Sequence, residues 1–236
     1  YIDQINTIEE LTSDKFFTWG WKYRYNHYPV GILQNTDKKK YNLINNINKI
    51  LIVLPNLERQ RHFYDTRLKY ENSINSGIEI LKTCRKANFK DTVFRFHHDD
   101  FKIIQGKEKN FLEFNKDIVI DYGNSDIKKK IDNNTLVIFT YLSSGFFELL
   151  SLNCKCLSIF DLDKKILHPK FYNKIKKLEK DKIIFHDNQK LSKHVESLIL
   201  KKKFYFKNNS VSKYQKVFLK EYGNLRNIKE KLNRIL

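Results

Sequence analysis

The sequence predicts a doubly wound α/β fold, in which helices cover both faces of a parallel sheet. From residue 49 onward, short apolar segments of strand length alternate with longer segments in which apolar residues recur at helical spacing. The short segments are continuously apolar, which is typical of parallel strands buried on both faces. Polar groups follow the ends of these strands. In doubly wound sheets, ligands bind outside the carboxyl ends of the strands, so a binding cleft is expected there.

The predicted strands and helices follow one another in a regular order. The first strand is the run Ile-Leu-Ile-Val-Leu at 50–54, which ends at Pro55 because proline has no backbone N–H for the sheet. Leucine and isoleucine at helical spacing predict a helix over 66–86. The other predicted elements are strands at 92–96, 118–121, 136–140, 156–161 and 183–185 and helices at 125–132, just after 144, at 166–179 and from about 189. Six strands in this rhythm indicate a Rossmann-like sheet.

The two ends of the chain differ from this central region. Residues 1–48 contain the aromatic stretch FFTWGWKYRYNHYPVGIL without the strand–helix rhythm, and we interpret them as a connector or the end of a preceding unit. Residues 49–208 form the predicted Rossmann-like domain, and 209–236 a helical tail. The chain starts with Tyr1 and has no Met, so we expect a fragment from which an N-terminal domain is missing.

The chain is strongly basic. It has 45 Lys and Arg residues against 27 Asp and Glu, a formal net charge of +18. Such a charge favours anionic partners, among them nucleic acids, nucleotides, acidic glycans and anionic lipids. The lysine runs at 38–40, 128–130 and 201–203 are spread over separate segments, which indicates a solvated surface. Nucleic acid is therefore not the expected partner, whereas peripheral contact with an anionic membrane stays open.

Several function classes have no matching motif in this sequence. There is no P-loop, no G-x-G-x-x-G, no G-x-S-x-G and no zinc signature. These absences argue against a P-loop NTPase, a dinucleotide-dependent dehydrogenase and an α/β-hydrolase. The three cysteines, Cys84, Cys154 and Cys156, are expected to be small core residues. No bound metal or cofactor is predicted.

The stretch TYLSSGFFELLSLN is the strongest candidate for a binding site. A buried strand leads through Ser143, Ser144 and Gly145 into a helix, so that backbone N–H groups and the positive end of the helix dipole face whatever lies above the turn. The alternative is that the serines only cap the helix. Glu148, one turn further on, can accept the two hydroxyls of a ribose, or it can be a favourable acid near the helix start.

A second polar cluster follows the next predicted strand, in the stretch RFHHDD that starts at Arg95. His97 and His98 can donate to a phosphate oxygen, and His98 with Asp99 can form a general base held in one tautomer. Arg59, in the loop after the first strand, can bind a phosphate through hydrogen bonds from its guanidinium group. For each residue the alternative is an ordinary surface charge.

These motifs, in their order and spacing, resemble a known group of enzymes. The segment SSGFFELLSLNCKCLSIFD is similar to the donor-binding segment of GT-B glycosyltransferases. FFTWGWK, YPVGIL, ILIVLP, VFRFHHDD, TYLSSGFFELLSLN and IIFHD, in that order, resemble the C-terminal half of a family of bacterial surface-polysaccharide transferases. More distantly, the chain resembles GT-B transferases of CMP-activated sialic acid and Kdo. Where those enzymes have a His-Pro motif, this chain has His98-Asp99.

The resemblance implies a role for each matching residue. Ser143 and Ser144 would bind the donor phosphate, Glu148 the ribose, and His97 or His98 a phosphate oxygen. Together with the residues inferred above, the predicted donor-binding set is Arg59, Arg95, His97, His98, Ser143, Ser144, Gly145 and Glu148. The catalytic residue is not identified, with His98 and Asp99 as candidates, because the base of GT-B enzymes usually comes from the N-terminal domain.

The sequence therefore predicts the donor-binding half of a glycosyltransferase that makes cell-surface polysaccharide. The expected partners are a nucleotide-sugar, with a CMP-sugar favoured over UDP- and GDP-sugars, and a glycan acceptor. The expected location is the cytoplasm or the inner face of the membrane. Two alternatives remain: a basic module that binds nucleic acid or anionic membrane, and a GT-B-like nucleotide-sugar epimerase.

Overall fold

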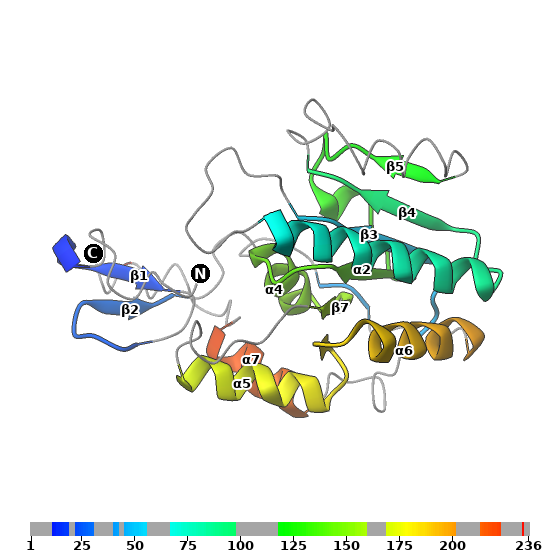
Figure 1. Ribbon diagram of the computed structural model, residues 1–236. Helices are drawn as coiled ribbons and strands as arrows, with labels where there is room; N and C mark the ends of the chain where they lie inside the picture. The colour runs from blue at the N-terminus through cyan, green and yellow to red at the C-terminus, as the bar shows by residue number, and fades with distance from the viewer. Residues whose placement is uncertain are drawn as a thin grey trace.

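The structure is a computed structural model that describes residues 11–18, 22–30, 40–42, 45–55, 67–97, 118–159, 169–201, 213–222 and 233. Its main feature is a parallel sheet of six strands in the order β5-β4-β3-β6-β7-β8 (Figure 1). The strands are β3 (Lys49–Val53), β4 (Thr92–Arg95), β5 (Val119–Asp121), β6 (Thr135–Phe139), β7 (Lys155–Ile159) and β8 (Ile184–Phe185). This sheet confirms the predicted Rossmann-like α/β class.

The path of the chain through the sheet has one reversal. It begins at the centre in β3, moves outward through β4 to β5, returns to the other side of β3 as β6, and continues outward through β7 to β8. The reversal lies between β3 and β6, whose residues pair from Lys49 with Thr135 to Val53 with Phe139. In doubly wound sheets this switch point is where a crevice opens at the carboxyl edge.

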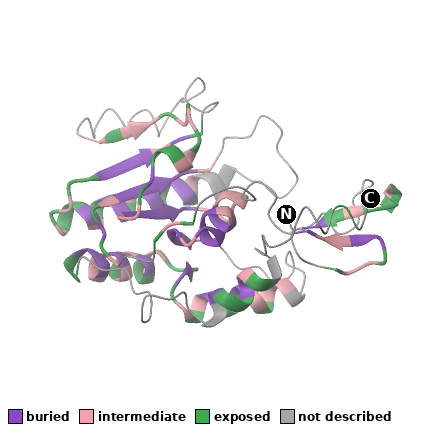
Figure 2. Cartoon of the chain, turned by 180° about the vertical axis from the view of Figure 1, so that it is seen from behind, coloured by how far each residue is buried: buried purple, intermediate pink, exposed green. Residues whose placement is uncertain are grey.

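Helices cover both faces of the sheet, which explains why the central strands are almost entirely apolar (Figure 2). On one face, α2 (Arg67–Lys86) and α6 (Asn188–Lys201) share a core cluster with alternate residues of the strands. On the other face, a second cluster joins the sheet to α4 (Ser144–Ser151), α5 (Pro169–Lys180) and α7 (Lys213–Tyr222). Burial of both faces is the principal apolar contribution to stability.

One glycine allows α2 to approach the sheet closely. A Cβ atom at Gly77 would lie 3.0 Å from Leu54 Cδ2 and 3.3 Å from Phe94 Cε1, both tighter than ordinary van der Waals contact. The missing side chain therefore sets the distance between α2 and the strands beneath it. The sequence predicted a helix over 66–86 but gave no reason for a glycine in its middle, where glycine costs helix stability.

The N-terminal region forms a separate two-stranded parallel sheet of β1 (Phe16–Thr18) and β2 (His27–Pro29). This pair accounts for part of the predicted aromatic, strand-like stretch 16–33; residues 19–21 and 31–33 lie outside the described residues. A later segment of the region reaches the main domain, because Tyr41 N donates to Leu152 O at 2.7 Å. Residues 40–42 thus contact the end of α4.

Most predicted strands are shifted by about one residue from those of the structure, and one predicted helix is much shorter. The helix predicted at 125–132 is only the 3-10 turn η3 (Ile127–Lys129), since Asp126 caps it and Asp132 already forms the next turn with Asn134. The strand predicted from 156 begins one residue earlier, at Lys155. In the described ranges, no helix combines the length and apolar character needed to cross a membrane.

Candidate functional site

The switch point places the end of β6 and the start of α4 at the carboxyl edge of the sheet. Val53 and Phe139 are partners at the ends of β3 and β6. Beyond them, Thr140 donates to Val53 O through its backbone N at 3.0 Å and its Oγ1 at 3.2 Å. Thr140 is buried, so it ties the two strands together underneath the turn. The residues that follow it, 141–145, are half-buried.

The first serine of the turn caps α4. Ser143 has extended backbone angles, φ −129° and ψ 161°, and its Oγ accepts a hydrogen bond from Phe146 N at 3.2 Å. This is the geometry of an N-cap residue, whose side chain satisfies one of the N–H groups at the helix start. The capping alternative left open by the sequence is therefore correct for Ser143.

The next two residues contribute differently. Ser144 is the first residue of α4 and Gly145 the second, so their N–H groups lie in the first turn, where a helix offers no acceptor of its own. A Cβ at Gly145 would lie 3.5 Å from Phe139 Cε1 and 3.6 Å from Ser143 Oγ, which are ordinary contact distances. Packing inside the protein thus leaves room for an alanine here, in contrast to Gly77.

Glu148 lies on α4 and forms an ion pair. Its Oε2 accepts from Lys128 Nζ at 3.0 Å, and the two side chains are only 17% and 14% exposed. Lys128 belongs to η3, so the pair joins the segment after β5 to the helix of the candidate site. Whether Glu148 also contacts a ribose, as the resemblance implies, stays a prediction.

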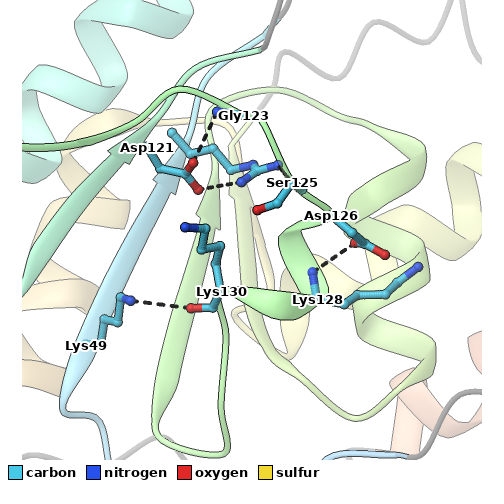
Figure 3. Close-up of polar contacts among 8 residues, drawn as sticks. Lys49, Asp121, Gly123, Ser125, Asp126, Lys128 and Lys130 are labelled. Atoms are coloured by element: carbon cyan, nitrogen blue, oxygen red, sulfur yellow. Dashed lines mark hydrogen bonds and ion pairs between the residues drawn. The ribbon is translucent and has the colours of Figure 1, made fainter.

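Arg95, at the end of β4, is held by the protein itself. Its Nη1 pairs with Asp121 Oδ2 at the end of the neighbouring β5, and its Nη2 donates to Ser125 O. Both side chains of the pair are 11% exposed. Figure 3 shows Asp121 beside Gly123 and Ser125, and Asp121 Oδ1 also accepts from Gly123 N at 3.1 Å. Arg95 therefore fixes the loop after β5.

The remaining predicted residues divide into two groups. His97 is exposed just beyond β4. Arg59, His98 and Asp99 lie outside the described residues. Among the residues that are described, no three His, Cys, Asp or Glu side chains gather in a group that could hold a metal ion.

A comparison with protein families adds to this geometry. The family model described as "LIC12162 family transferase" matches residues 3–231, nearly the whole chain. The chain belongs to this transferase family. No curated protein and no solved structure matches it significantly. Membership of the LIC12162 family makes this chain a transferase.

Two residues that contact members of the candidate site, Asp121 and Lys128, were not found from the sequence. Asp121 could have been found, because an acid at the end of one strand and an arginine at the end of its neighbour are natural partners. Lys128 had no such signal. It is the first of three consecutive lysines, and only the fold distinguishes it from Lys129 and Lys130, which are exposed.

Proposed function

We propose that this transferase is a GT-B glycosyltransferase and that its six-stranded domain binds a nucleotide-sugar donor at the start of α4. The observation that carries the proposal is the position of Ser144 and Gly145: they open a helix at the switch point of a doubly wound sheet, between β3 and β6. Helix N-termini at such positions bind phosphates because free N–H groups and the helix dipole both favour negative charge.

The chemistry expected of this site is stabilisation of a leaving group. When a glycosyl group leaves its donor, negative charge develops on the nucleotide phosphate. The N–H groups of Ser144 and Gly145 and the hydroxyl of Ser144 are donors that require no rearrangement to meet that charge. Glu148, one turn below, is the proposed partner of the ribose. The donor class is a nucleotide-sugar, with a CMP-sugar preferred.

The proposed reaction also needs an acceptor and a catalytic base, in addition to the donor site at the start of α4. A glycan acceptor, the assembly of surface polysaccharide and a base supplied by another domain are the parts of the proposal that rest on the resemblance alone. His98 and Asp99 remain the candidates for catalysis within the chain. Peripheral contact with the inner face of a membrane would suit the basic charge of +18.

The test is calorimetric titration of the chain with CMP, UDP, GDP and ADP, compared with the variants Ser143→Ala and Ser144→Ala. Since Ser143 caps α4, Ser143→Ala should lower the free energy of unfolding by about 1 kcal/mol. Ser144→Ala should leave stability within about 0.5 kcal/mol. It should also weaken binding of the preferred nucleotide about tenfold, because one hydrogen bond to a charged phosphate is lost.

Two outcomes would contradict the proposal. One is saturable binding of a nucleotide that Ser144→Ala leaves unchanged, since the ligand would then lie elsewhere. The other is the absence of nucleotide binding combined with salt-dependent binding of short DNA or of vesicles containing anionic lipid, which would favour the basic binding module. Transfer of the sugar from a radiolabelled donor to a glycan distinguishes a transferase from an epimerase.

A further inference from the structure

Lys128 differs from the other lysines of its run. In a sequence with runs of lysine on solvated surfaces, three consecutive lysines at 128–130 look alike. In the structure Lys129 and Lys130 are exposed, whereas the side chain of Lys128 is only 14% exposed and meets Glu148 of α4 at 3.0 Å. The side chains of Lys128 and Lys130 leave the turn in different directions (Figure 3). A specific contact thus sets Lys128 apart.

The backbone of Lys128 is fixed from two sides. Its N–H donates to Asp126 Oδ1 at 2.9 Å, which caps η3, and its carbonyl accepts from Tyr41 Oη at 3.4 Å. Ile127 packs against the core cluster of the same face. The ammonium group is therefore presented to α4 by a turn that is anchored on its own, and removing the charge should leave that turn in place.

Stability alone gives a weak reason for this ion pair. Withdrawing an ammonium and a carboxylate from water costs free energy that their attraction only partly returns, so apolar side chains at the same positions would stabilise the domain as well or better. The carboxylate is that of Glu148, on the helix whose first turn forms the proposed phosphate site. A charge held in one place beside a binding site is a common way to orient a hydrogen-bond acceptor.

We propose that Lys128 is a positioning residue for recognition of the donor's ribose. It holds the Glu148 carboxylate in one orientation, so that this group accepts hydrogen bonds from the ribose hydroxyls. The inference rests on the proposed function, because it assumes that a nucleotide occupies the start of α4. It adds that the preference for ribose over deoxyribose depends on a residue that does not touch the nucleotide.

The test is the ratio of dissociation constants for a 2′-deoxynucleotide and its ribonucleotide, measured by calorimetry. The probes are CMP, UDP, GDP and ADP, each with its 2′-deoxy counterpart. For the chain itself we expect a ratio of about 10, as for loss of one hydrogen bond to a charged group. Lys128→Met and Lys128→Gln should reduce the ratio to about 2, since Glu148 loses its ion pair with Lys128. Lys128→Arg should restore most of it.

The matched control is Lys129→Met, which removes the same charge from the neighbouring exposed position and should leave the ratio unchanged. If Lys128 had a purely structural role, its substitution would weaken binding of the ribonucleotide and the 2′-deoxynucleotide equally. The ratio of their dissociation constants would then stay the same, and this result would overturn the inference. A chain that binds both nucleotides equally well would overturn it too, and leave the proposed function standing. If the chain binds no nucleotide at all, the proposed function and the inference both fail.

Discussion

The two edges of the six-stranded sheet use their polar residues in different ways. At the amino edge these groups bond to one another: Lys155, only 3% exposed, donates to Asn133 O, and Asp132 Oδ1 accepts from Thr135 Oγ1 and Asn134 N, both at 2.8 Å. At the switch point of the carboxyl edge, α4 begins with N–H groups that a helix cannot satisfy itself. Polar groups thus satisfy one another at the amino edge, whereas the start of α4 offers N–H groups for the proposed ligand.

The carboxyl edge itself contains both kinds of arrangement. Arg95 and Asp121 lie at the ends of β4 and β5, yet they bond to each other as the residues of the amino edge do. In the described residues, the part near β3 and β6 is where we propose that a ligand binds. Position at the carboxyl edge is therefore not sufficient evidence of a binding role. A side chain there can instead be bonded to another residue of the protein, as Arg95 is to Asp121.

The largest expected effect comes from breaking the buried pair of the carboxyl edge. Arg95→Met should lower the free energy of unfolding by about 3 kcal/mol, because it leaves the Asp121 carboxylate without its cation in a place that is mostly closed to water. Chemical denaturation followed by circular dichroism measures this change. Equal stability of Arg95→Met and the unaltered chain would mean that Arg95 does not fix the loop after β5.

A smaller effect is expected at the amino edge. Asp132→Asn should cost about 0.5–1 kcal/mol at neutral pH, because Asp132 is exposed and water screens its charged contacts, and leave the dissociation constant of the nucleotide unchanged. Although burial opposes it, hydrogen bonds from Thr135 and the N–H of Asn134, together with the charges of Lys155 and Lys49, hold the pKa of Asp132 below its ordinary value of 3.8. The ionised group is therefore preferred in the folded chain.

The pH dependence of this variant follows from that shift. Because the unfolded chain takes up the proton first, the contribution of Asp132 is complete above about pH 4 and disappears as the pH falls through the lower pKa of the folded state. The stability of Asp132→Asn should therefore fall less steeply below pH 4. Unfolding curves at pH 3 and pH 7 test this, and parallel losses in both proteins would contradict it.

The smallest expected effect comes from replacing a helical glycine by alanine, either Gly145 in α4 or Gly77 in α2. Gly145→Ala should raise the free energy of unfolding by about 0.5–1 kcal/mol, since alanine favours a helix and finds room there. Because its Cβ would contact Phe139 and Ser143 Oγ at ordinary distances, the dissociation constant of the nucleotide should change little. Gly77→Ala is the comparison: its Cβ meets Leu54 at 3.0 Å, so it should lower the free energy of unfolding. Equal stability changes in the two variants, measured by chemical denaturation, would contradict this difference in packing.

Much of the fold could be predicted because its strands carry an unambiguous signal. β3 and β6 are continuous apolar runs, which only a sheet covered on both faces explains. The predicted strand starts at Cys156, whereas β7 includes Lys155, a residue type that is almost never fully buried unless it is paired. Lys155 donates to the carbonyl of Asn133, which lies 22 residues earlier in the chain, before β6. The sequence around Lys155 therefore does not reveal this contact.

The candidate site could be located but not resolved into roles. The pattern Ser-Ser-Gly before an apolar helix indicated where the helix begins. It did not show which serine is the N-cap, because that role depends on backbone angles, which differ between Ser143 and Ser144. Likewise Glu148 was recognised as an acid of the first turns, whereas Lys128 comes from a segment 20 residues earlier in the chain. Local patterns find elements; side-chain partners from different elements need the fold.

The reversal of the chain between β3 and β6 also has a consequence for synthesis. Lys49 of β3 is the partner of Thr135 in β6, so roughly 80 residues separate the two central strands, a distance that slows folding. At about 5–20 residues per second, β3 leaves the ribosome several seconds before its second neighbour exists. During that time a strand that is finally buried on both sides presents an unpaired edge. The order in which this sheet is translated therefore creates a period in which the nascent chain is open to chaperones and to aggregation.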